Sequence, residues 1–198
     1  MKIARRQPKP SSRKEETHRR IVDAAARSIR ATGYDGTGVA DIMKSVGLTH
    51  GGFYAHFGSR EAMLAEAADL AGAHGIAALE RVAAAAPPQE SLRALLRAYL
   101  SKAHADGVAI GCPVVALGSE MPRQAPEVRR AATRRIKEFI DLVARQSPDW
   151  GRPGAHERAL VTVATMVGAL LLARAVDDPK LAEDLREAAL GHLTSQPV

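Results

Sequence analysis

Two short apolar segments separated by a three-residue turn constrain this chain more than any other feature of its sequence. Apolar residues recur at helical spacing over 39–46, and Gly47-Leu48-Thr49 then breaks the period before Phe53 and Phe57. Two short amphipathic helices joined by a tight, glycine-containing turn have the geometry of a helix-turn-helix. We therefore predict that the segment 37–60 folds as this motif, with Phe53 and Phe57 facing inward.

The composition predicts that the rest of the chain is helical as well. Of 198 residues, 46% are hydrophobic, which is enough for a substantial core, and only 4% are aromatic, which disfavours sheets. A first helix is expected from residue 17 to a stop at Gly33, and Ser59 is placed to cap a long helix that ends before Pro87-Pro88. Further helices are expected over 89–105, 114–120, 126–145, 156–176 and 179–193.

The positive charge is concentrated near the N-terminus. Residues 1–60 hold 12 Lys or Arg against 5 Asp or Glu, whereas residues 61–198 hold 16 against 17. A basic unit joined to a nearly neutral remainder is typical of a polyanion-binding domain attached to a domain with another task. We expect a flexible basic arm over 1–14, a DNA-binding domain over 15–60 and a helical regulatory domain over 61–198. The arm is either a minor-groove contact or a solubilising terminus.

The sequence carries no signal for export and no clear membrane span. Basic residues and prolines interrupt the first ten residues, where a signal peptide needs an apolar stretch. The longest apolar run, 159–173, falls short of the ~20 residues that cross a bilayer, so we expect a buried helix there.

The single cysteine, Cys112, excludes an internal disulfide and suits a reducing compartment. A cytoplasmic location without a membrane partner is therefore expected.

The residues around the turn suit contacts with double-stranded DNA. The second helix of a helix-turn-helix lies in the major groove, with its N-terminal residues against base edges and its flanks on phosphates. Thr49 can cap this helix and bond a phosphate, while His50, Gly51 and Gly52 occupy its groove-facing start. The alternative is that the two glycines merely form a loop between helices.

The runs GYDGTGVADI at 33–42 and GLTHGGFYAHFGSRE at 47–61 resemble the N-terminal domain of the TetR family of bacterial repressors. The resemblance implies an all-α protein, with a three-helix DNA-binding domain followed by a larger helical domain for ligand binding and dimerisation. Gly38 departs from the pattern, since many relatives place Ser or Thr there as a helix cap, and Thr37 is expected to take that role. The DNA contacts that the resemblance implies are phosphate bonds from Thr37 and Thr49, base contacts from His50, Gly51 and Gly52, and a backbone clamp by Tyr54, His56 and Arg60.

The similar family uses its C-terminal half to form a homodimer. Two helices from each subunit would build a four-helix interface, and two-fold symmetry would place the recognition helices about 34–36 Å apart. The alternative is that the same residues form an intramolecular core. The expected interface residues are Leu160, Val163, Ala164, Val167, Gly168, Leu171, Leu181, Leu185, Ala188 and His192.

The resemblance also implies a small-molecule effector, whose site would be a mostly apolar cavity between helices. The candidate lining residues are Leu95, Leu96, Tyr99, Cys112, Val115, Phe139, Val143 and Met166. The run GCPVVALGSE at 111–120 is similar to a segment from one branch of the family, in some members of which a nearby cysteine senses electrophiles. A helix N-terminus at Cys112 would favour the reactive thiolate, and a buried, inert thiol is the alternative.

The sequence gives little support to catalysis or to a cofactor. It contains no P-loop, no GxSxG nucleophile elbow and no HExxH metal motif, so we expect neither a metal nor another cofactor. A sequence-specific transcriptional regulator, most simply a repressor released from a palindromic operator by a ligand or by modification of Cys112, is the leading interpretation. An α-helical enzyme and a non-specific nucleoid-type DNA binder are the alternatives, and operator preference over bulk DNA separates them.

Overall fold

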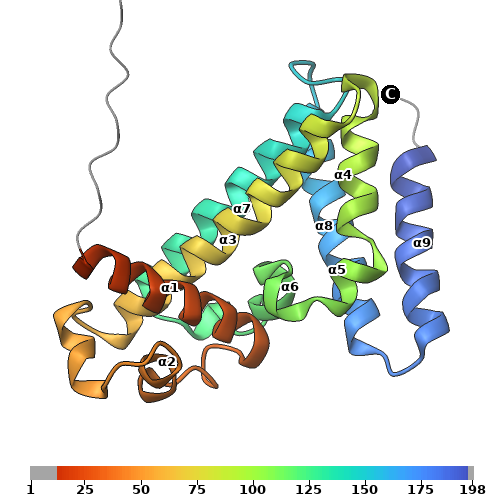
Figure 1. The fold of residues 1–198 in the computed structure, drawn as a ribbon. Helices are drawn as coiled ribbons and strands as arrows, with labels where there is room; N and C mark the ends of the chain where they lie inside the picture. The colour runs from red at the N-terminus through yellow and green to blue at the C-terminus, as the bar shows by residue number, and fades with distance from the viewer. Residues whose placement is uncertain (1–12, 196–198) are drawn as a thin grey trace, which may run out of the picture.

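The computed structural model describes residues 13–195, and these residues fold entirely into helices and connecting turns, without a strand (Figure 1). The prediction of an all-α fold is confirmed. Four short 3₁₀ segments connect the α-helices: η1 (His50–Ala55), η2 (Pro88–Glu90), η3 (Val108–Ile110) and η4 (Met121–Arg123). The α-helices are α1 (Arg13–Thr32), α2 (Val39–Ser45), α3 (Arg60–Ala85), α4 (Ser91–Tyr99), α5 (Lys102–Asp106), α6 (Pro113–Leu117), α7 (Pro126–Gln146), α8 (Ala155–Ala175) and α9 (Pro179–Ser195).

Several predicted helix ends are confirmed by the structure. Gly33 adopts a left-handed backbone with φ of 77° just after α1, which is the conformation that favours glycine. Ser59 caps α3, since its Oγ accepts a hydrogen bond from the N–H of Ala62 at 3.0 Å. The arm predicted over 1–14 lies outside the described residues, except that Arg13 and Lys14 already belong to α1.

Three predicted helices differ in the structure. The single helix expected over 89–105 is two, because Ser101 interrupts it and caps α5 by accepting a bond from the N–H of His104 at 3.2 Å. The helix expected over 114–120 ends early, and 3₁₀ helix η4 follows it. The expected recognition helix is the 3₁₀ helix η1, which contains two residues of low helix propensity, Gly51 and Gly52.

The N-terminal unit, defined as α1, α2, η1 and the first half of α3, packs around one core, to which Leu117 of α6 and Val128 of α7 also contribute. The fully buried members of this core include Ile21, Ile29, Met43, Phe53 and Met63. Phe57 is also buried, so the inward orientation predicted for Phe53 and Phe57 is confirmed. Its last α3 residue is Ala71, so this core extends beyond residue 60, where the sequence placed the domain boundary.

A second core lies between α4, α7 and α8, against the second half of α3. Its buried members include Leu95, Tyr99, Phe139, Val143 and Met166. The long helices α3 and α7 lie side by side and extend from the N-terminal unit to this second core (Figure 1). Their close approach depends on Gly72, because a Cβ there would lie 2.6 Å from the Cβ of Arg135.

Helices α8 and α9 form the edge of the molecule and leave apolar surface uncovered. The helix α8 is, among the described residues, the one long and apolar enough to cross a membrane, and 33% of its most apolar stretch is buried. The prediction of a buried helix over 159–173 holds for one face of α8, which packs in the second core, while Leu160, Val161, Leu171 and Leu172 are exposed. Helix α9 contributes no buried residue to the core.

Candidate nucleic-acid interface and effector cavity

The short helix η1 presents its polar residues to solvent. Thr49 is its N-terminal cap by position, but its hydroxyl makes no capping hydrogen bond. Thr49 and His50 are exposed, and Tyr54 is 69% exposed with its ring edge-on to that of His50 at 6.4 Å. The buried ring of Phe53 anchors the opposite side. The exposed face of η1 therefore presents a hydroxyl, an imidazole and a phenol, while the buried ring of Phe53 fixes the position of the helix.

The two glycines of η1 are not required by internal packing. A Cβ at Gly51 would meet nothing within 4 Å, and a Cβ at Gly52 would lie 3.6 Å from the methyl group of Met43, an ordinary contact. Neither glycine has the positive φ that favours this residue. Gly51 is exposed, so its lack of a side chain leaves room for another molecule to approach the backbone of η1, whereas a Cβ at Gly52 would face the buried Met43.

Thr37 differs from its expected role. It is completely buried, its hydroxyl donates to the carbonyl of Gly33 at 2.8 Å, and Ser28 Oγ lies 3.0 Å away. This hydroxyl therefore has no exposed surface for a phosphate. The expectation that Thr37 caps α2 is wrong, because the cap position is Gly38 and no side chain bonds the helix end.

Arg60 holds the turn between α1 and α2. Its Nη2 donates to the carbonyl of Tyr34 and, at 3.1 Å, to the carbonyl of Thr37. These contacts use Nε and Nη2 and fix the chain that leads into α2. Arg60 is partly exposed, and its contact with the DNA backbone stays a prediction.

His56 lies half-buried at the end of η1, beside α1. Its Nδ1 is buried and has no hydrogen-bond partner among the described residues. Desolvation lowers the pKa of His56, and the neighbouring His18 and Lys14 lower it further. His18 itself stacks on Phe57 at 4.5 Å and bonds Glu66 at 2.7 Å, so it ties α1 to η1 and α3.

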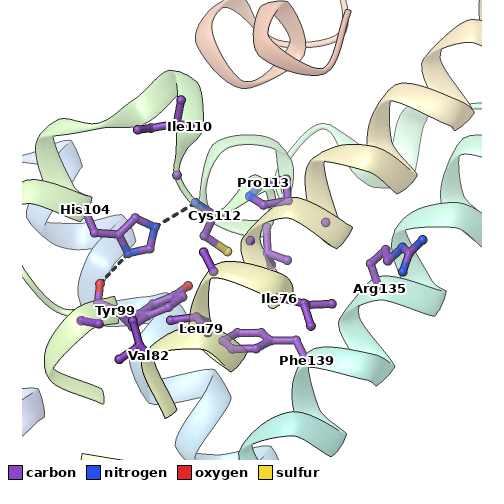
Figure 2. Close-up of a pocket in the computed structure, with 16 residues that line it drawn as sticks. Ile76, Leu79, Val82, Tyr99, His104, Ile110, Cys112, Pro113, Arg135 and Phe139 are labelled. Carbon is purple, nitrogen blue, oxygen red and sulfur yellow. Dashed lines mark hydrogen bonds between the residues drawn. The ribbon is translucent and has the colours of Figure 1, made fainter. Parts of the chain in front are cut away.

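A cavity of about 190 Å³ lies between α3, α4, α7 and the loop that leads into α6 (Figure 2). Of the predicted lining residues it is lined by Tyr99, Cys112 and Phe139. The other five pack in the adjacent core and do not line it: Leu95, Leu96, Val115, Val143 and Met166. The α3 wall of the cavity, its histidine and its arginine were not predicted from the sequence; these residues are Gly72, Gly75, Ile76, Ala78, Leu79, Val82, His104 and Arg135.

His104 connects two walls of the cavity (Figure 2). Its Nδ1 donates to the carbonyl of Tyr99 at 2.6 Å, and its Nε2 accepts the N–H of Cys112 at 3.0 Å. A carbonyl can only accept and an amide N–H can only donate, so this pair fixes the neutral imidazole with its proton on Nδ1. Burial and the nearby Arg174 lower the pKa of His104, against a smaller opposing effect of the Tyr99 carbonyl.

Cys112 stands at the start of α6 with its side chain buried, facing the cavity. The hydroxyl of Tyr99 lies on the same side of the cavity wall (Figure 2). The pKa of Tyr99 is raised well above its ordinary value, first by burial and then by the Cys112 thiol. Tyr99 therefore keeps its proton at neutral pH.

Most of the residues expected at a dimer interface lie on one exposed face of α8 and α9. Leu160, Leu171 and Leu181 are each at least 39% exposed, and a Cβ at Gly168 would meet open space. Ala164, Ala188 and His192 are exposed, and Val167 and Leu185 are half-buried. Val163 is the exception, because it is 7% exposed and packs in the second core.

Within the described residues, no group of three or more His, Cys, Asp or Glu side chains could hold a metal ion. The polar side chains of the site gather on η1 and around the cavity. Neither place carries the ligand cluster of a metal centre.

Both halves of the chain are similar to known transcriptional regulators. Residues 21–67 match the family described as bacterial regulatory proteins of the tetR family, and residues 88–188 match the C-terminal domain of LmrA/YxaF-like transcriptional regulators. An uncharacterized HTH-type transcriptional regulator of Mycobacterium tuberculosis, Rv0196, is 35% identical over 164 residues, which cover 78% of this chain and 82% of the relative.

Solved structures show the same fold. A TetR transcriptional regulator from Chloroflexus aurantiacus is 28% identical, with a TM-score of 0.76 over 92% of this chain and 96% of the other. The reduced form of NemR from E. coli is 20% identical, with a TM-score of 0.75 over 90% and 95%. These similar proteins are regulators and not enzymes. With its helix-turn-helix, its second helical core and these relatives, the chain belongs to the TetR family of DNA-binding transcriptional regulators.

Proposed function

We propose that this regulator is a cytoplasmic repressor, which binds a palindromic operator as a homodimer and leaves it when a small molecule occupies the cavity. The observation that carries the proposal is that one connecting segment, 107–121, which contains the short helices η3 and α6 and is called the 107–121 loop below, both lines the cavity and contacts the N-terminal unit. Cys112 contributes to the cavity wall, and Glu120 accepts the backbone N–H of Tyr34 at 2.8 Å. A ligand that moves this loop also moves the turn that leads into α2.

The proposed DNA contacts come from the outer face of η1 and the residues beside it. Thr49 and Tyr54 bond phosphates, and His50 reads base edges, because these side chains are exposed on the face opposite Phe53. Gly51 and Gly52 admit the DNA backbone or base edges close to the chain, and His56 adds a donor at the flank. Thr37 acts indirectly in this proposal, by fixing the turn before α2, and Arg60 fixes the same turn besides contacting the DNA backbone.

The proposed homodimer buries the apolar face of α8 and α9. An uncovered set of leucines on a helix at the edge of a domain is typical of an interface rather than of a solvated surface. A two-fold axis through this face makes the interface isologous and sets the separation of the two η1 helices. Specificity then depends on half-site spacing as well as on His50.

Modification of Cys112 is the second proposed route to release. Its thiol lines the same cavity, so a group added to the sulfur occupies the space that a ligand would fill. The test is alkylation with iodoacetamide, which forms an S–C bond and displaces iodide, while the thiol proton passes to the buffer. Alkylation should lower the operator affinity of the wild-type protein and not that of Cys112→Ser. Unchanged operator binding by fully alkylated protein contradicts this route.

The repressor proposal is tested with the full chain and a promoter that contains its selected operator. Addition of the protein to an in vitro transcription reaction should reduce the transcript from that promoter and leave a promoter with a scrambled operator unchanged. An increased transcript would show an activator. Equal effects on both promoters would contradict operator-specific regulation.

A further inference from the structure

We propose that the cavity takes an uncharged molecule about the size of one substituted benzene ring, whose single hydrogen-bond acceptor pairs with the hydroxyl of Tyr99. The inference rests on the proposed function, since it names the chemical class of the effector for the same cavity.

The volume of the cavity indicates the size of the ligand part that it can enclose. This volume is about 190 Å³. An engineered apolar cavity of about 150 Å³ holds one benzene molecule, whereas pockets for drug-sized ligands run to about 300–1,000 Å³. One six-membered ring with one small substituent fits the space. The wall is mostly aliphatic and aromatic, from residues such as Ile76, Leu79 and Phe139 (Figure 2).

The hydroxyl of Tyr99 supplies the polar group that such a ligand must satisfy. Tyr99 is 1% exposed, and its hydroxyl makes no hydrogen bond of normal geometry among the described residues. The neighbouring thiol of Cys112 is a weak partner, and it leaves the hydroxyl able to bond a better acceptor. Buried polar groups almost always have a partner, so an orphaned hydroxyl at a cavity wall indicates a group that the ligand provides. Because burial raises the pKa of Tyr99, the phenol keeps its proton and can donate a hydrogen bond, and the complementary ligand atom is a hydroxyl, ether or carbonyl oxygen.

Arg135, the arginine that lines the cavity, is already paired with carboxylates of its own helix and of α3. Arg135 donates to Asp69 from Nε at 2.9 Å and to Glu138 from Nη1 at 2.6 Å. Both nitrogens of His104 are in use. Arg174 lies outside the lining and donates to the carbonyls of His104 and Ala105 at 2.6 and 2.9 Å, while its Nη1 is buried and has no hydrogen-bond partner among the described residues. A carboxylate in the cavity would be desolvated without a new partner, which disfavours anionic ligands.

Three probes of similar size test the need for a hydrogen-bond acceptor and for the absence of charge: toluene has no acceptor, benzyl alcohol has one, and benzoate carries a negative charge. Their affinities for the full-length wild-type protein are measured by isothermal titration calorimetry. We expect benzyl alcohol to bind, and benzoate to bind at least tenfold more weakly. Tyr99→Phe should weaken benzyl alcohol by about fivefold, the value of one neutral hydrogen bond, and should leave toluene unchanged or tighter.

Gly75 offers a variant that fills the cavity without a clash. It lines the cavity, and a Cβ there would meet nothing within 4 Å. Gly75→Leu should abolish binding of benzyl alcohol, while Gly75→Ala, which raises helix propensity in the same way, should retain it. Circular dichroism establishes that both variants are folded.

The results of these measurements distinguish a failure of this inference from a failure of the proposed function. Operator binding of the same samples is measured without probe. If the protein binds its operator but none of the three probes, or binds benzoate as well as benzyl alcohol, the inference is overturned while the repressor proposal stands. Equal loss of toluene and benzyl alcohol in Tyr99→Phe would also overturn it, because the hydroxyl would then have no specific partner.

Discussion

Arg30, in the last turn of α1, donates a hydrogen bond from Nε to the backbone carbonyl of Ala109 in η3, with a separation of 2.7 Å. The side chain crosses from the N-terminal unit to the loop that carries Cys112, and it is 4% exposed. Burial lowers the pKa of its guanidinium, yet the group stays charged because an arginine titrates far above neutral pH. Together with the bond between Glu120 and Tyr34, this contact ties both ends of the loop to the DNA-binding unit.

Replacement of Arg30 by Met should weaken this connection. Arg30→Met removes the donors and leaves the carbonyl of Ala109 without its partner, so the free energy of unfolding should fall by about 1–3 kcal/mol. Urea denaturation measures the change. The concentration of effector needed to release the operator should also rise, since the loop and α1 would move less together. Arg81→Met, at an exposed position on α3, is the control and should change neither quantity.

The stability of the protein should depend on pH through His104. The fold favours the neutral imidazole, so the folded-state pKa lies below its ordinary value of 6.5. The contribution of His104 is therefore complete above pH 6.5 and is lost as the pH falls below that value, with a slope of at most about 1.4 kcal/mol per pH unit. Urea denaturation between pH 7.5 and 5 measures this slope. His104→Asn should flatten it and His74→Asn, at an exposed site on α3, should not; equal slopes in both variants would contradict the role of His104.

His50 and Tyr54 should affect operator binding differently. Tyr54→Phe removes one hydroxyl from a phosphate contact, so it should weaken binding by about fivefold on every sequence. His50→Ala removes a base contact, so it should reduce discrimination at one operator position, where a mismatch costs about 1–3 kcal/mol. Fluorescence anisotropy with the operator and its single-base variants checks both. A uniform loss for His50→Ala would assign that residue to the DNA backbone.

The exposed face of α8 should determine the oligomeric state. Leu171→Glu places a charge in the proposed interface, which should weaken the dimer on the order of 100-fold. Sedimentation velocity at micromolar concentration should then show a monomer. Lys137→Glu, which changes the charge at an exposed site on α7, is the matched control and should stay dimeric. A monomeric wild-type protein would contradict the proposed interface outright.

The parts of the fold that depend on local sequence could be predicted. Gly33, Ser59 and Pro87 end or begin helices through their own backbone and side-chain chemistry, and the period of apolar residues locates the long helices. The split at Ser101 could not be predicted in this way, because it is stabilised by the contacts of His104 with Tyr99 and Cys112.

The cavity was only partly predictable for a similar reason. Tyr99, Cys112 and Phe139 were correctly predicted to line the cavity. Leu95 and Met166 were predicted with them but belong to the core, and the local sequence around a residue does not show whether it faces a cavity or the core. The wall from α3 follows from the packing of Gly72 against Arg135, a contact between residues 63 positions apart in the chain. The pair Gly72 and Gly75 on one helix was the available signal for that close approach.

The most direct test of DNA recognition selects binding sites for the full-length protein from a random library of double-stranded DNA. The affinity for the selected site is then compared with that for a scrambled site at the same salt concentration. We predict a palindromic site, bound about 10³-fold or more tightly than the scrambled DNA, with an affinity that falls steeply as salt rises. Equal affinity for both DNAs would contradict a sequence-specific regulator.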